Sequence, residues 1–223
     1  MGFLDDLKRQ ADEAKARLNT DTSQLERNAA LTDAACKTAS NYFSTLVQQL
    51  NVLQPRSKAT YRLDKRNAFE ALPLLDFRAD ARRKRLRANE AFDHVALRWR
   101  MNSGTRLLLV KDFLPEIEQL ESRLRRSGAQ FHAETVRNPE TNKLQEMRYE
   151  FVADFEAAVN ITPDHDAARL RFELVNLDGF ETVTVEFPAF EVGTGRMDEL
   201  ARWIMGEPHA FLKGGQGLRR LEA

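Results

Sequence analysis

Several features that assign proteins to a class are scarce in this sequence. Its 223 residues include one cysteine, Cys36, which excludes a disulfide within the chain and is typical of a reducing compartment. No uncharged apolar run approaches the roughly 20 residues of a membrane-spanning helix. The N-terminal segment also lacks the apolar region of a signal peptide. We therefore expect a cytoplasmic protein without a transmembrane segment.

Motifs that identify an enzyme or a metal site are missing as well. The sequence contains no G-x-S-x-G, G-x-x-x-x-G-K-[ST] or H-E-x-x-H pattern. None of the four histidines has a second histidine or a cysteine at metal-ligand spacing. His165 lies between two aspartates, but this segment follows Pro163 and is typical of a turn. We expect no cofactor and no metal, and no catalytic residue can be named.

What the sequence does contain is a division of charge. Over the whole chain, 34 lysines and arginines balance 34 aspartates and glutamates. Residues 56–111 nevertheless carry a net charge of +9, and residues 131–200 carry a net charge of −9. A block of one sign is typical of a surface that attracts a partner of the opposite sign. The division therefore favours an interaction protein over an enzyme.

Residues 1–54 are predicted to form a helical hairpin. Apolar residues recur at steps of three and four within residues 2–18 and again within residues 25–50, which places them on one face of each helix. Asp21 or Thr22 can cap the second helix, because each offers a side-chain oxygen to unpaired N–H groups. Cysteine falls on the apolar face of that helix, where we predict a small buried hydrophobe instead of a reactive thiol.

The rest of the chain is predicted to form two ββββα units. In residues 56–128 and again in residues 129–206, segments with alternating apolar residues precede a helical segment that ends at glycine. Short connections favour antiparallel neighbours, and we expect helices to cover the sheet. The predicted fold class is therefore α+β. Residues 207–223 contain three closely spaced glycines and are predicted to form a flexible tail.

The two units share local identities in the same order. Phe77 corresponds to Phe151, and the segment from Asn102 to Gly104 corresponds to the segment from Asn176 to Gly179. We predict that these two segments form equivalent hairpin turns, since asparagine and glycine tolerate positive φ. The shared order favours an internal duplication. The alternative is that strand–turn–helix units with similar turn chemistry resemble one another without common descent.

The densest group of basic residues is the candidate interaction site. It consists of Arg82, Arg83, Lys84, Arg85 and Arg87 on one predicted strand, with Arg98 and Arg100 on the next. Because side chains alternate between the faces of a strand, a run of successive charges must stand clear of the core. Such a group can neutralise the carboxylates of a protein or the phosphates of a nucleic acid.

These patterns leave several hypotheses open. The first is a non-enzymatic interaction or scaffold protein that binds another protein, or a second copy of itself, through charge-complementary surfaces. The alternative is a nucleic-acid-binding module that acts through the basic region 78–106, although only Phe92 and Trp99 are available there to stack on bases. A third is an enzyme or small-ligand carrier with a site between sheet and helices. Finally, the two charge blocks can neutralise each other within one chain.

Overall fold

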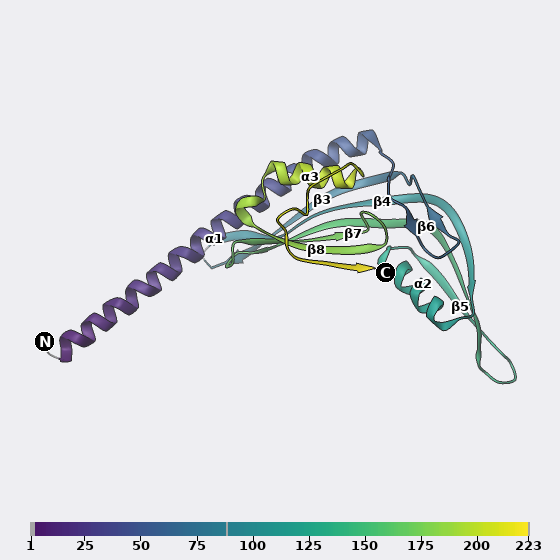
Figure 1. Ribbon diagram of the computed structural model, residues 1–223, viewed down its shortest axis with the longest axis horizontal. Helices are drawn as coiled ribbons and strands as arrows, with labels where there is room; N and C mark the ends of the chain where they lie inside the picture. Colours follow the sequence, from purple (N-terminus) through teal and green to yellow (C-terminus); the bar gives the residue numbers. More distant parts are fainter. Residues whose placement is uncertain (1–2, 88, 223) are drawn as a thin grey trace.

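The computed structural model describes residues 3–87 and 89–222, which contain three α-helices and a mainly antiparallel sheet. Helix α1 (Phe3–Leu53) extends far beyond the rest of the molecule at its N-terminal end (Figure 1). Its C-terminal half lies with α3 (Thr194–Ile204) on one side of the sheet. Helix α2 (Leu114–Arg126) lies near the opposite end of the sheet. The fold class is α+β.

Helix α1 is continuous, so the predicted helical hairpin is wrong. Its 51 residues contain neither glycine nor proline, the two residues that most readily interrupt a helix. Asp21 and Thr22 are suitable capping residues, but a cap stabilises a helix start only where the chain has left the helix before it. The helix ends instead before Pro55, where Gln54 adopts a left-handed conformation with φ of 44°.

The main sheet combines both predicted units. Within the described residues its order is β3 (Leu74–Leu86), β4 (Asn89–Lys111), β6 (Leu144–Asp164), β7 (Arg169–Val175), β8 (Glu181–Pro188) and β9 (Gln216–Glu222), with every neighbouring pair antiparallel. Strand β5 (Phe131–Arg137) pairs with the first part of β6. Strands β1 (Tyr61–Arg62) and β2 (Ala68–Phe69) form a separate hairpin, and a short 3-10 turn, Ala189–Glu191, follows β8.

The long strands β4 and β6 form the centre of the sheet. They pair over most of their length, with a register shift between Asn102 and Arg106. The hairpin turn predicted in this segment is therefore wrong, because the chain stays in β4 and forms a bulge. The Asp154 carboxylate accepts hydrogen bonds of 3.0 Å from the N–H groups of Ser103 and Gly104. Gly104 has a φ of 63°, and a glycine at positive φ is as typical of a bulge as of a turn.

Strand β6 has two partners on one side, β5 and β7, and the end of α2 fills the space between them. There the N–H of Glu156 donates a 2.7 Å hydrogen bond to the carbonyl oxygen of Ser127. The side-chain amide of Asn176 donates to the carbonyl oxygens of Arg126 (3.1 Å) and Glu156 (2.8 Å). Asn176 thus joins α2, β6 and the turn after β7.

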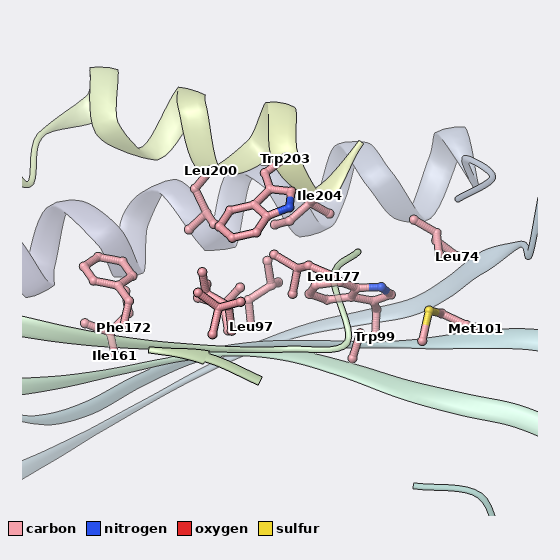
Figure 2. Packing of buried hydrophobic residues seen from close by; sticks show 14 of the residues in the cluster. Leu74, Leu97, Trp99, Met101, Ile161, Phe172, Leu177, Leu200, Trp203 and Ile204 are labelled. Carbon is pink, nitrogen blue, oxygen red and sulfur yellow. The ribbon is translucent and has the colours of Figure 1, made fainter. Parts of the chain in front are cut away.

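The core lies mainly between the sheet and the two helices α1 and α3, and Ile117, Leu120 and Leu124 of α2 belong to it as well. Every second residue of β6 from Tyr149 to Ile161 is buried, which is the period of a strand with one covered face. Figure 2 shows Leu200 and Trp203 of α3 directed towards Leu97 and its neighbours on the sheet. The opposite face of β4, β6 and β7 is mainly polar, and it carries exposed side chains such as those of Arg98, Arg100 and Glu156.

The internal duplication is not confirmed. Both blocks follow the order ββββα, as β1–β4 with α2 and β5–β8 with α3. Their strand pairing differs, because β1 and β2 form their own sheet whereas β5 and β6 belong to the main one. Gly104 lies in a bulge inside β4, while Gly179 lies in the connection between β7 and β8. The two glycines therefore have different structural roles.

The segment predicted to be a flexible tail, residues 207–223, is folded where the structure describes it. Phe211 is fully buried. Its ring contacts those of Phe172, Phe187 and Trp203. The Arg196 guanidinium donates a 2.7 Å hydrogen bond to the carbonyl oxygen of Phe211. A Cβ at Gly215 would lie 2.3 Å from a methyl carbon of Val185, so this glycine allows close packing and is not a sign of flexibility.

The basic and acidic blocks lie side by side, because β4 belongs to the first and β6 to the second. Arg106 on β4 forms an ion pair with Glu150 on β6. Arg87, which follows β3, lies 2.5 Å from Asp166, which follows β6. Part of the charge division is therefore neutralised within the chain.

Candidate functional site

The seven basic residues identified from the sequence lie at one edge of the main sheet. Arg82, Arg83, Lys84 and Arg85 belong to the edge strand β3, Arg87 follows that strand, and Arg98 and Arg100 belong to β4. Every residue from Arg78 to Arg85 is exposed, so the strand stands clear of the core. Charged side chains on an edge strand also prevent unwanted pairing with other strands.

Most of the basic run on β3 is paired with acidic groups of the same chain. The Arg83 guanidinium lies 3.5 Å from the Asp33 carboxylate of α1 and 4.5 Å from the centroid of the Phe92 ring. Lys84 lies 2.7 Å from Asp93 on β4. Exposed ion pairs of this kind contribute at most about 1 kcal/mol each. The run therefore has a structural role in attaching the edge strand to its neighbours.

A hollow of about 590 Å³ opens on the polar face of the sheet. Five arginines line it: Arg78 from β3, Arg98 and Arg100 from β4, and Arg125 and Arg126 from the last turn of α2. We call it the arginine hollow. Its lining also includes two carboxylates, those of Asp76 and Glu156. Because cations outnumber anions in a concave site, the local potential is positive.

Arg78 and Arg98 face each other directly across the β3–β4 ladder. Both side chains are exposed, and neither has a hydrogen bond or ion pair to another described residue. Like charges placed opposite each other destabilise a sheet. Arg100, by contrast, lies 3.4 Å from the Asp76 carboxylate. The Arg78–Arg98 pair therefore lacks a counter-charge that an external anion can supply.

Of the five arginines, the site residues predicted from the sequence include only Arg98 and Arg100. Arg78 begins the predicted basic region 78–106 but is not among them, and Arg125 and Arg126 were missed. The last two were visible as basic residues in a predicted final helical turn, where they complement the helix dipole. Only the fold brings that turn next to Glu156 on β6. Conversely, none of the residues from Arg82 to Arg87 lines the hollow. The candidate site thus includes Arg98 and Arg100 of β4, as predicted. It does not include the run from Arg82 to Arg87, and its other arginines come from the start of β3 and from the distant helix α2.

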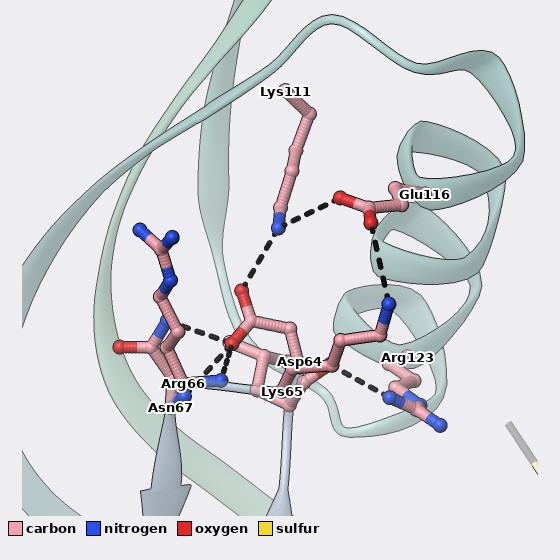
Figure 3. A network of polar contacts seen from close by, with 8 residues as sticks. Asp64, Lys65, Arg66, Asn67, Lys111, Glu116 and Arg123 are labelled. Carbon is pink, nitrogen blue, oxygen red and sulfur yellow. Dashed lines mark hydrogen bonds and ion pairs between the residues drawn. The ribbon is translucent and has the colours of Figure 1, made fainter.

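A second hollow, of about 910 Å³, lies between the β1–β2 hairpin, the end of β4 and α2. Figure 3 shows the polar network on its wall. The Lys111 ammonium lies 3.2 Å from the Asp64 carboxylate and 3.3 Å from that of Glu116. The Arg123 guanidinium donates a 2.9 Å hydrogen bond to the carbonyl oxygen of Leu63. These contacts attach the hairpin to β4 and α2.

Asp64 and Lys111 of this network keep their charges at neutral pH. Burial tends to raise the pKa of Asp64, but hydrogen bonds from the backbones of Arg66 and Asn67 and from Lys111 outweigh it and lower the pKa. Burial tends to lower the pKa of Lys111, but Asp64 and Glu116 outweigh it and raise the pKa. Both groups are therefore charged over the neutral range. A group poised for proton transfer would have its pKa shifted towards neutrality.

Other chemically capable groups are used in the fold. Cys36 is fully buried, and burial, followed by the nearby charge of Asp33, raises its pKa to about 12, so the predicted role as a buried hydrophobe is confirmed. His165 lies in the predicted turn, and its Nε2 is 2.7 Å from the carbonyl oxygen of Phe92. No cluster of three or more His, Cys, Asp or Glu side chains in the described part of the chain is arranged to hold a metal ion.

The described helices do not combine the length and the apolar character that crossing a lipid bilayer requires.

The arginine hollow on the polar face of the sheet is suited to holding an anion, because its five guanidinium groups outnumber its two carboxylates. No protein-family model matches the chain, and neither a curated protein nor a solved structure matches it.

Proposed function

We propose that the protein is a non-enzymatic interaction protein that binds an acidic segment of a partner protein in the arginine hollow. The observation that carries the proposal is the Arg78–Arg98 pair, two exposed cations that oppose each other across a ladder without a counter-charge. A carboxylate between them relieves their repulsion. Guanidinium groups suit this role because their planar forks bind carboxylates with two parallel hydrogen bonds.

The remaining residues of the arginine hollow restrict which anion fits. Arg125 and Arg126 stand at one side of the hollow and extend the positive surface from the strands to α2. The carboxylates of Asp76 and Glu156 repel a ligand whose charge is spread evenly along its length. A partner segment with acidic residues at a few positions therefore matches the hollow better than a uniformly charged polymer.

Nucleic acid is a weaker match than an acidic peptide. Trp99 lines the hollow, but it is 3% exposed and its ring stacks on Phe77 with centroids 5.5 Å apart, so it offers no face to a base. Single-strand binders combine a basic groove with exposed aromatic side chains. On β3 the run beyond Asp80 is largely paired within the chain, which interrupts any track for successive phosphates.

The arginine hollow also differs from a typical small-ligand site. It opens on the exposed face of the sheet beside the last turn of α2, outside the space that α1 and α3 cover. Pockets for small ligands are mostly apolar and enclosed, with a few convergent polar groups. Seven of the thirteen residues that line the hollow are charged. An interaction surface is therefore the better description.

Fluorescence anisotropy tests the proposal with two labelled probes, a short glutamate-rich peptide and a single-stranded oligonucleotide of similar length. The double variant Arg78→Gln/Arg98→Gln should weaken peptide binding about tenfold or more, since each hydrogen bond to a charged group contributes about 1.5–3 kcal/mol. The matched control, Arg171→Gln/Arg219→Gln, removes two exposed arginines outside the hollow and should leave affinity nearly unchanged.

Two results would overturn the proposal. Equal weakening by the two double variants would show that only net charge matters. Tighter binding of the oligonucleotide than of the peptide, lost in the hollow variant, would favour the nucleic-acid alternative. Circular dichroism of all variants checks that the fold is retained, which is expected because the four arginines are exposed.

A further inference from the structure

Strand β4 has an unpaired edge in its second half. Strand β3 pairs with β4 only as far as Met101. No strand in residues 3–87 and 89–222 pairs with the segment from Arg106 to Lys111 on the side away from β6. This segment contains the apolar run of three leucines and a valine, with Leu108 67% exposed and Val110 49% exposed. An exposed apolar edge is a template for pairing with another strand.

We propose that this edge pairs with the same edge of a second copy of the chain, forming a two-fold symmetric dimer with a continuous sheet. The axis of such a dimer runs perpendicular to the sheet and leaves each face on its own side. Residues that lie opposite each other must then belong to the same face. Side chains alternate between the two faces along a strand. The two-fold axis must therefore pass through a residue that pairs with its own copy, because an axis between two residues would pair side chains from opposite faces.

One register matches the side chains of the two edges. With Leu109 opposite Leu109 of the second copy, Leu108 lies opposite Val110 and Val110 opposite Leu108. The two exposed apolar residues then cover each other. Arg106 then lies beside Asp112 of the second copy, the first residue after the end of β4, so opposite charges meet at both ends of the apolar pairs. Asp112 is exposed and has no hydrogen bond or ion pair to a described residue, which leaves it available for this contact.

The neighbouring registers lack this match. Centring on Leu108 places Arg106 opposite Val110, and centring on Val110 places Leu108 opposite Asp112. On the exposed face of the sheet, each of them sets a charge against an apolar side chain, which loses cross-strand stabilisation. The register centred on Leu109 does so only on the covered face, where Leu107 lies opposite Lys111, and the Lys111 ammonium keeps its ion pairs with Asp64 and Glu116. The other edge strands of the described residues offer no comparable run. Strand β3 presents successive basic residues, β5 has no run of apolar residues, and the exposed Leu218 and Leu221 of β9 are separated by two arginines. A second copy is therefore the occupant that the edge of β4 itself specifies.

A charge-swap series tests the dimer by sedimentation equilibrium over a range of concentrations. Arg106→Asp places two aspartates opposite each other, and Asp112→Arg places two arginines opposite each other. Each change occurs twice in the symmetric interface, so each single variant should weaken dimerisation about tenfold to a hundredfold. The double variant Arg106→Asp/Asp112→Arg restores opposite charges in the same register and should recover the dimer.

The double variant separates the interface from effects within one chain. Arg106 also pairs with Glu150, and Arg106→Asp and the double variant both lose that contact, whereas Asp112→Arg keeps it. Recovery in the double variant therefore reports only the contact between copies. Arg171→Asp, on an exposed position of β7 away from the edge, should leave the dimer intact. A wild-type chain that stays monomeric at high concentration, or a double variant that dimerises no better than the singles, would overturn the proposal.

The dimer and the proposed peptide site rest on different residues. Arg106 and Asp112 do not line the arginine hollow, and Arg78 and Arg98 do not belong to the unpaired edge. Loss of peptide binding in the hollow variant with an intact dimer, or the reverse, would show which of the two inferences fails.

Discussion

Asn176 should be a main contributor to stability, because one buried side chain joins three segments. Its amide donates hydrogen bonds to the carbonyl oxygens of Arg126 and Glu156, and the residue is 1% exposed. Asn176→Ala removes both bonds and leaves two carbonyl groups without these donors. Alanine must also adopt the left-handed conformation that asparagine holds here, with φ of 58°. Hydrogen-bond loss and backbone strain therefore act together.

The magnitude follows from these two contributions. Each lost hydrogen bond costs about 1 kcal/mol, and a buried group left unsatisfied costs more. A residue other than glycine, asparagine or aspartate in the left-handed region costs about 1–2 kcal/mol. We expect Asn176→Ala to lower the free energy of unfolding by about 3–4 kcal/mol. This is a large share of the roughly 5–15 kcal/mol by which proteins are stable.

Asn142 provides a matched control for the backbone contribution. It has a similar φ of 54°, but it is exposed, and its side chain has no hydrogen bond to a described residue. Asn142→Ala should therefore cost only about 1–2 kcal/mol. Urea titrations of both variants, with the wild type alongside, measure the difference. Equal effects of the two substitutions would refute the claim that the hydrogen bonds of Asn176 stabilise the junction.

Three further predictions concern the core, the charge network and the thiol. Phe43→Ala should lower the free energy of unfolding by about 2–5 kcal/mol in a urea titration, because the ring is buried. The exposed Gln48→Ala should change it by less than about 0.5 kcal/mol. Since its pKa is lowered on folding, Asp64 contributes stability above the aspartate pKa of the unfolded chain, and this is lost as pH falls through the folded pKa. Asp64→Asn should thus destabilise the protein at neutral pH, and by progressively less as pH falls below the aspartate pKa of the unfolded chain; a difference in thermal melts that stays constant down to the lowest pH at which the protein is folded would contradict this. Cys36, buried and with a pKa of about 12, should react with a thiol reagent no faster than the protein unfolds.

Local patterns predicted burial well. The apolar stripe of the long helix placed Cys36, Phe43 and Leu46 in the core, and all three are buried. Helical spacing is a local property, so neighbours in sequence decide which face is apolar. The continuity of α1 was missed although local sequence indicated it. A capping residue was visible at Asp21, but the absence of glycine and proline on both sides of it was the stronger signal.

Features that depend on contacts distant in sequence were not predictable. Gly104 has the same local chemistry in a turn and in a bulge, and its contact with Asp154, 50 residues away, decides between them. The arginine hollow is a similar case, because it needs α2 to end beside β6. Phe211 anchors a segment whose composition alone suggests flexibility, since the aromatic rings that surround it come from two strands and a helix.

The length of α1 affects how the molecule moves in solution. At about 1.5 Å per residue, its 51 residues span about 75 Å, and the N-terminal part continues past the sheet as a rod (Figure 1). A particle with such a rod has higher friction than a sphere of equal mass. Gel filtration will therefore suggest a mass above the 25.6 kDa of one chain even for a monomer. In the two-fold dimer the rods point in opposite directions, so small-angle scattering should show a large increase in maximum dimension on dimerisation.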